Sequence, residues 1–160
     1  MATDYTVIQA VRQQFGDTQR DWDEFPIPWV EGNAPFVGVS KDFPFSCPSV
    51  DRSQMAVLQF NTLGVSGWNN TLQINGVDIA GGISVGPLWI YLDPHVPLWN
   101  TESQLVDAGV LEEENILHIE SKPTQSGNFD DFIIDNIVIW FKTRTGRVTE
   151  PGVPPAKPAS

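Results

Sequence analysis

The sequence predicts an all-β fold in which two antiparallel sheets pack face to face as a sandwich. Apolar and polar residues alternate over strand length in several separate segments, which is the period of a half-buried strand. Turn formers separate these segments, since the 160 residues include 13 Gly and 13 Pro. No helical pattern alternates with the strands, which disfavours an α/β fold. The length and a hydrophobic content of 41% suit one domain with a real core.

The N-terminal third contains few regular patterns. Residues 4–15 fit neither the helical nor the strand period cleanly, and we favour a strand because the rest of the chain is β-like. Five prolines interrupt residues 16–48, which excludes a long helix and leaves loops and short extended pieces around residues 35–39. We expect a division into an arm that packs on the sandwich (1–48), a sandwich core (49–143) and a flexible Pro-rich tail (144–160).

The central segments predict strands joined by tight turns. Gln54–Asn61 alternates strongly, and Leu72–Ile79 contains Asn75-Gly76, a pair typical of a two-residue hairpin turn with φ > 0 at both positions. Residues 83–85 and 88–92 are further strand candidates. Residues 103–108 suggest a short helical turn that ends at Gly109.

Two strands close the predicted sandwich. Asn115–Glu120 alternates between polar and apolar residues, whereas Phe132–Phe141 is apolar almost without a break. Such a run predicts a strand buried on both faces, with Trp140 in the core. A polar loop, residues 121–131, joins the two strands.

Three pieces in a fixed order carry a resemblance to a known fold. They are LQINGV (72–77), GVLEEENILHIE (109–120) and DDFIIDNIVIWF (130–141). Together they resemble the galactose-binding-like jelly-roll superfamily, which includes many carbohydrate-binding modules, and the resemblance covers residues 53–141. It implies a two-sheet jelly roll whose ligands meet end loops or a concave sheet face, often with a structural calcium. By position, Asn128, Asp130 and Asp131 resemble the residues that precede the last strand in sugar-binding members.

Charge and cysteine content narrow the function classes. A formal net charge of −11 argues against a nucleic-acid partner and against adsorption to anionic membranes. It suits neutral polar ligands, divalent cations or a basic protein partner. The single cysteine, Cys47, excludes an internal disulfide, and its uncharged neighbours predict a buried, inert thiol. No signal peptide or membrane-length apolar run is visible, so we expect a cytoplasmic protein or one released as part of an assembly.

Tryptophans in polar loops are the candidate sugar platforms. A flat ring stacks on the apolar face of a pyranose, while neighbouring amides and carboxylates bond its hydroxyls. The candidate ligand-binding pairs are Trp68 with Asn69 and Trp99 with Asn100, and Trp22 lies between two aspartates. The alternative is that these rings close the ends of the core, as we expect for Trp89.

The turn before the last strand is the candidate metal site. Asn128, Asp130 and Asp131 offer three oxygen ligands within four positions, which suits calcium, and the same residues are candidates for binding a glycan. A plain turn that faces water is equally compatible with the pattern.

No segment carries a convincing catalytic signature. Gly82-Ile83-Ser84-Val85-Gly86 matches the nucleophile-elbow pattern, but its β-branched residues and the proline that follows oppose the strand-to-helix turn that an elbow requires. His95 and His118, the two histidines, lack the spacing of a zinc site.

The leading hypothesis is therefore a non-catalytic, lectin-like carbohydrate-binding β-sandwich. A structural or adaptor subunit of a viral, phage or injection-machine assembly, with a protein partner or as a homo-oligomer, is the alternative. A carboxylate-dependent glycoside hydrolase or lyase is the third and weakest reading.

Overall fold

The computed structural model describes residues 1–19, 34–86 and 99–144, and these residues contain ten strands and no helix. The chain folds into two sheets, so the predicted all-β, two-sheet sandwich is confirmed. The six-stranded sheet contains β1 (Ala2–Gln9), β2 (Gln13–Phe15), β3 (Phe36–Gly38), β5 (Ala56–Leu63), β8 (Trp99–Val106) and β10 (Phe132–Thr143). The four-stranded sheet contains β4 (Ser40–Ser46), β6 (Thr71–Ile74), β7 (Val77–Asp78) and β9 (Glu114–Glu120).

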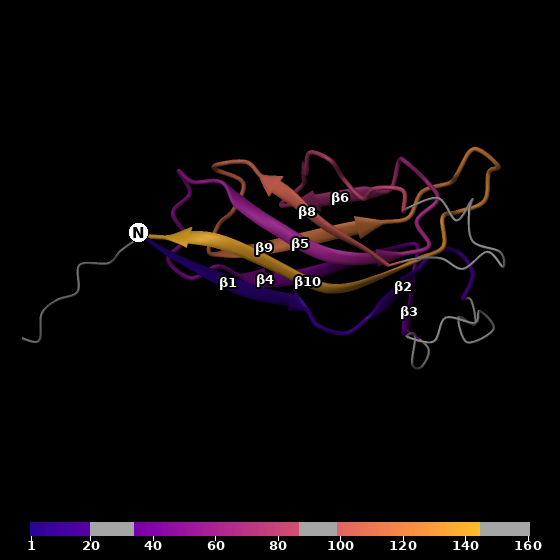
Figure 1. Cartoon of the computed structure of the whole chain (residues 1–160), viewed down its shortest axis with the longest axis horizontal. Helices are drawn as coiled ribbons and strands as arrows, with labels where there is room; N and C mark the ends of the chain where they lie inside the picture. The colour runs from indigo at the N-terminus through magenta and orange to yellow at the C-terminus, as the bar shows by residue number, and fades with distance from the viewer. Residues whose placement is uncertain (20–33, 87–98, 145–160) are drawn as a thin grey trace, which may run out of the picture.

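The six-stranded sheet has the order β3-β2-β10-β5-β8, and β1 also pairs with β10. β1 and β2 share one edge of β10, and Ala2 lies opposite Thr143, so the N-terminus sits beside the end of the last strand (Figure 1). The other sheet has the order β4-β9-β6-β7. Among the described pairs, β2 with β3 is parallel and the others are antiparallel. The first 48 residues, expected to pack on the sandwich, thus supply four strands of the sheets themselves.

The core lies between the two sheets. Ala56, Leu58 and Phe60 of β5 point inward, as the alternation predicts, and face Leu117 and Ile119 of β9 in one continuous cluster. Aromatic rings fill the end of this cluster where β10 begins; the rings of Phe15 and Phe132 stack with centroids 5.3 Å apart. Cys47 is buried in the same cluster, which confirms the predicted buried thiol.

The predicted hairpin at Asn75-Gly76 is confirmed. The two residues link β6 to β7 with φ values of 53° and 78°, both in the left-handed region. The Asn75 amide also donates to the carbonyl of Val110 and to the side chain of Asn115, so this turn is tied to the turn before β9.

The predicted helical turn at residues 103–108 is wrong over residues 103–106, which belong to β8, and a turn follows at residues 108–110. All eight residues of β8 pair with β5, and this ladder decides the structure of a sequence whose local preference is weak. The predicted strand at residues 83–85 is also absent, since these residues form a bend and an extended loop. The candidate strand at residues 88–92 lies outside the described residues.

The last strand is buried on both faces over its first three residues, Phe132–Ile134. A bulge follows between Asp135 and Val138, where Asn136 has φ 50°, and inward and outward residues then alternate. The prediction that Trp140 lies in the core is wrong: its side chain is 41% exposed and its ring packs against Tyr5 at 5.1 Å between centroids. Beyond the bulge the outer face of this sheet is exposed to solvent. The apolar residues of β10 are therefore buried on both faces only before the bulge.

Candidate functional site

Two loops meet at the end of the sandwich where β5 ends and β10 begins (Figure 1). We call residues 64–70 the Trp68 loop and residues 121–131 the Pro123 loop. A pocket of about 640 Å³, open to solvent, lies between the two loops. The described lining residues come equally from the two loops: Ser66, Gly67, Trp68, Asn69, Pro123, Thr124, Gln125 and Ser126.

The buried carboxylate of Asp130 holds the Trp68 loop in place. Asp130 is 1% exposed and accepts hydrogen bonds from the Ser66 amide at 3.0 Å and the Ser66 hydroxyl at 2.6 Å. The Gly67 amide and the Asn70 side-chain amide donate to its other oxygen at 2.9 and 2.6 Å. Buried carboxylates are stable when donors surround them, so these contacts both satisfy the charge and fix the loop.

Side-chain amides connect the two loops directly. The Asn69 amide donates to the Pro123 carbonyl at 3.1 Å, and the Lys122 backbone amide donates to the Asn70 side-chain oxygen at 3.0 Å. Asn69 and Asn70 thus link the platform residue Trp68 to the opposite wall of the pocket. These two hydrogen bonds fix the Trp68 loop to the Pro123 loop.

The tip of the Pro123 loop is a tight hairpin turn. The Gly127 amide donates to the Thr124 carbonyl at 2.9 Å, and the Thr124 amide donates to the Asn128 carbonyl at 2.7 Å. Gly127 has φ 86°, which matches a type I turn followed by a left-handed residue that closes a bulge. The hydroxyls of Thr124 and Ser126 lie 2.8 Å apart and come to the pocket wall together.

Trp68 is 81% exposed, the largest exposed fraction among the large apolar residues that the structure describes. Beneath it, the backbone of Gly67 approaches the Asp130 carboxylate so closely that an added Cβ would lie 3.2 Å from an oxygen. The pocket therefore combines a solvent-facing indole ring with amide and hydroxyl groups. This combination suits stacking on the apolar face of a ring while polar side chains bond its substituents.

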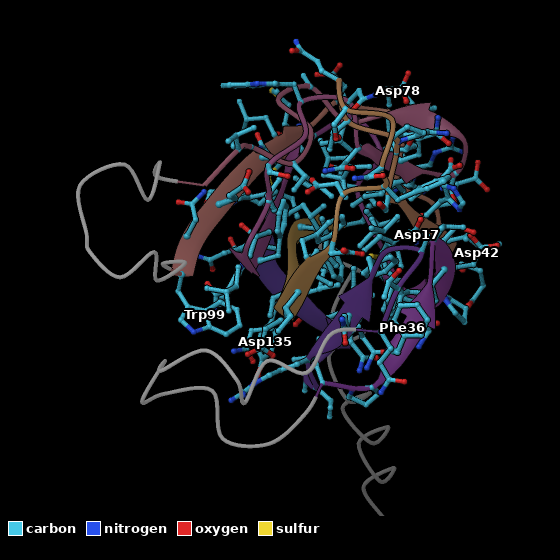
Figure 2. The ribbon with its side chains drawn as sticks, turned by 90° about the vertical axis from the view of Figure 1, so that its right-hand side faces the viewer. Asp17, Phe36, Asp42, Asp78, Trp99 and Asp135 are labelled. Atoms are coloured by element: carbon cyan, nitrogen blue, oxygen red, sulfur yellow. The ribbon has the colours of Figure 1, made fainter. Side chains whose placement is uncertain are left out.

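The predicted pair Trp99 and Asn100 lies elsewhere. Both are in β8, and neither is among the described residues that line the pocket. The Arg12 guanidinium lies 6.0 Å from the centroid of the Trp99 ring and also pairs with Asp135, at 3.9 Å between Nε and Oδ2. Figure 2 shows Trp99 and Asp135 side by side in this second group. Trp99 is half-buried and the Arg12 guanidinium lies over its ring, so this ring is less accessible for stacking on a sugar than that of Trp68.

The three residues of the predicted metal site have three separate surroundings. The Asn128 side chain is exposed, Asp130 is enclosed by donors, and Asp131 packs against Gly16, where an added Cβ would lie 1.9 Å from Oδ1 of Asp131. Both oxygens of Asp130 accept hydrogen bonds, and such a donor set does not fit a cation at these atoms. Within the described part of the chain, no cluster of three or more His, Cys, Asp or Glu side chains is arranged for a metal.

A second polar group crosses the outer face of the four-stranded sheet. His118 Nδ1 lies 2.6 Å from Asp42 Oδ1, its Nε2 lies 3.7 Å from Glu120 Oε2, and Lys122 Nζ lies 2.5 Å from the same Glu120 atom. The hydrogen bond from Lys122, with smaller effects of its charge and of His118, lowers the pKa of Glu120 below its ordinary value of 4.5. This is a solvated row of cross-strand pairs.

Cys47 offers no reactive thiol. Burial, followed by the nearby charges of Asp4 and Glu114, raises the pKa of Cys47 to about 12, so its thiol stays protonated and inert at neutral pH. Trp22, Trp89 and His95 lie outside the described residues.

The sequence pointed to Trp68 and Asn69 but missed Ser66, Thr124, Gln125 and Ser126. The oxygen ligands that the sequence predicts, Asn128, Asp130 and Asp131, lie at the C-terminal end of the Pro123 loop. Its N-terminal half faces the Trp68 loop through tertiary contacts between segments more than 50 residues apart, as in the bond from Asn69 to Pro123. Local sequence patterns do not encode such a contact.

Comparison with known proteins gives no match to a family model, a curated protein or a solved structure. In the residues that the structure describes, no helix has the length and apolar character needed to cross a membrane.

Proposed function

We propose that this protein is a non-catalytic, lectin-like carbohydrate-binding module built on a jelly-roll type of sandwich. One observation carries the proposal: an exposed Trp68 stands beside amides and hydroxyls in a pocket formed by two end loops. The resemblance of residues 53–141 to galactose-binding-like modules agrees with this placement, since end loops hold the ligand in many of them.

The chemistry of the pocket matches that of a pyranose. The indole of Trp68 stacks on the apolar face of the sugar ring, and the ring hydroxyls bond to Asn69, Thr124, Gln125 and Ser126. Because Asp130 already fixes the Trp68 loop, little conformational entropy is lost when the ligand binds.

The described pocket offers no pair of carboxylates that could catalyse hydrolysis. Glycoside hydrolysis uses two carboxyl groups that flank the scissile bond. No Asp or Glu is among the described residues that line the pocket, and Asp130 beneath it is occupied by four donor groups. We therefore place sugar binding ahead of catalysis.

A glycan array followed by calorimetric titration tests this function. We expect the wild-type protein to bind a defined glycan, Trp68→Ala to lose at least about tenfold in affinity, and Trp140→Ala to bind like wild type. Trp140 is the matched control because it is also an exposed tryptophan but lies on the outer sheet face. Absence of binding to every glycan would contradict the proposal.

The same titration in calcium and in chelator tests the predicted cofactor. Calcium at Asn128, Asp130 and Asp131 is what the sequence and the resemblance imply, whereas the donors that occupy both oxygens of Asp130 favour a result without calcium dependence. An affinity or a melting temperature that rises with calcium supports it, whereas identical values in calcium and chelator count against it.

A specific surface favours the second candidate function, a subunit of a larger assembly. Tyr5, Trp140, Val57 and Leu105 lie opposite one another on four adjacent strands and form an apolar row across the outer face of the six-stranded sheet. Tyr5 is 55% exposed and Leu105 56% exposed. Light scattering after size exclusion tests this candidate: a closed oligomer that Trp140→Asp dissociates supports it, and a monomer at high concentration contradicts self-assembly.

A further inference from the structure

We infer that the pocket between the Trp68 and Pro123 loops selects neutral sugars and rejects acidic ones. The inference rests on the proposed sugar binding and goes beyond it by naming the ligand class. Three features support it: the described pocket wall, the described charged groups next to the two loops, and the net charge of the full sequence.

The described pocket wall is uncharged. Its eight residues are an indole, one asparagine, one glutamine, three hydroxyl residues, a glycine and a proline. Asn69, Gln125 and the hydroxyls match the donors and acceptors of neutral sugar hydroxyls. A carboxylate or sulfate that entered this pocket would lose part of its hydration without gaining a cationic partner from these eight described residues, which is unfavourable.

The described charged groups next to the two loops, Asp130 and Lys122, do not supply that partner. Asp130 lies under the Trp68 loop and is negative, and its oxygens face Ser66, Gly67 and Asn70. Lys122 stands at the start of the Pro123 loop, but its ammonium pairs with Glu120 at 2.5 Å. The positive charge closest in sequence to the pocket is therefore neutralised at the outer face of the four-stranded sheet.

The long-range field acts in the same direction. A net charge of −11 repels anionic ligands and leaves neutral ones unaffected. Salt screens this repulsion over roughly 10 Å at 0.1 M ionic strength. The affinity for a neutral sugar should consequently not change with salt, while any residual affinity for an acidic sugar should increase with it.

Matched sugar pairs test the inference. The probes are the methyl glycosides of glucose, galactose and mannose and the corresponding uronic acids, which differ by a carboxylate in place of the C6 hydroxymethyl group. Binding is followed by the NMR shift of the Trp68 indole N–H, assigned by its absence in Trp68→Ala. We expect each neutral glycoside that binds to exceed its uronic acid by at least about tenfold at low salt, with an affinity independent of salt.

A charge variant provides the converse test. Gln125→Lys places a cation on the pocket wall, and Gln54→Lys places the same charge just before β5, at the opposite end of the sandwich. Gln125→Lys should increase the affinity for the uronic acid about two- to fivefold, the gain typical of an exposed ion pair, and Gln54→Lys should not.

Each result decides between two claims. If a uronic acid binds as well as its neutral partner, or better, the inference is wrong and the proposed sugar binding stands. An equal gain in Gln125→Lys and Gln54→Lys would also overturn the inference, because the effect would then come from net charge alone. If no sugar of either class binds, both the inference and the proposed function fall.

Discussion

Asp130 has a different role in the structure from the one that the sequence predicts. The sequence marked it as an oxygen ligand in front of the last strand, whereas the structure uses it as an internal acceptor that holds the Trp68 loop. The residue type is the same in both roles, because a carboxylate attracts amide donors as well as cations. The composition of the turn indicates that its acidic residues have a role. The hydrogen-bond partners of the Asp130 carboxylate lie 60 or more residues away in the sequence, so no local pattern predicts them.

Replacing Asp130 with Asn should destabilise the fold. The new amide group would point N–H donors at the amides of Ser66 and Gly67 or at the side chain of Asn70, leaving buried donors without acceptors. We expect a loss of about 2–4 kcal/mol in the free energy of unfolding. Urea denaturation measures it, with the exposed Asp107→Asn as a control that should change by less than about 0.5 kcal/mol.

Asp130→Asn should also weaken glycan binding, because the loop that presents Trp68 loses its anchor. A variant as stable as wild type would show that the hydrogen bonds to Asp130 do not hold this loop.

Glu120 makes one contribution to stability dependent on pH. Lys122 lowers its pKa in the folded state below the ordinary 4.5, so the folded state favours the carboxylate. The resulting stabilisation is present above the ordinary pKa and is lost as the pH falls through the lowered folded pKa. Because the pair is largely solvated, its size is at most about 1 kcal/mol.

Glu120→Gln should therefore reduce the acid-dependent fall in stability below pH 4.5 and leave a constant offset above it. Denaturation at a series of pH values measures both, with the exposed Glu113→Gln as the comparison. An unchanged pH profile in Glu120→Gln would contradict the assignment.

At the scale of elements, local signals predicted the hairpin and the alternating strands. Asn75-Gly76 needs no tertiary information, because the turn demands positive φ at both residues and few residue types supply it. β8 is different: its polar residues, such as Thr101 and Ser103, favour no element strongly, and its pairing with β5 fixes it as a strand. The prediction for Trp140 fails because the hydrophobicity of a residue does not say which face of a sheet is covered.

Gly76→Ala tests the hairpin geometry. The site has space for a methyl group, so the cost is conformational, about 1–2 kcal/mol for an L residue at φ 78°. Gly86→Ala is the matched control, since Gly86 has no positive φ and an added Cβ meets its nearest neighbour at 4.0 Å. Urea denaturation should place Gly76→Ala below wild type and Gly86→Ala at or slightly above it; equal effects would contradict the turn assignment.

At the scale of the whole molecule, the sequence predicts the all-β fold class but only one of the two loops that form the described pocket. The density of turn residues and the alternation of apolar and polar residues are properties of the whole chain, and they predict the sandwich. Half of the described pocket wall comes from the Pro123 loop, which no local pattern connects with Trp68. The strong negative charge is likewise a property of the whole chain.

Screening that charge should stabilise the fold. Repulsion among the acidic residues opposes the compact state, so salt that screens it raises the melting temperature. For a domain of this size, a gain of about 1 kcal/mol corresponds to about 2–4 °C. Calorimetry between low and moderate sodium chloride measures the shift, and a melting temperature that falls with salt would contradict a dominant self-repulsion.

The central claim is that Trp68 and the Pro123 loop form a sugar site, and paired titrations of two tryptophan variants test it most directly. Calorimetry with the best glycan from an array should show Trp68→Ala weakened at least about tenfold and Trp140→Ala equal to wild type. Equal affinities for Trp68→Ala and wild type, with both proteins folded, would show that the sugar binds elsewhere or not at all.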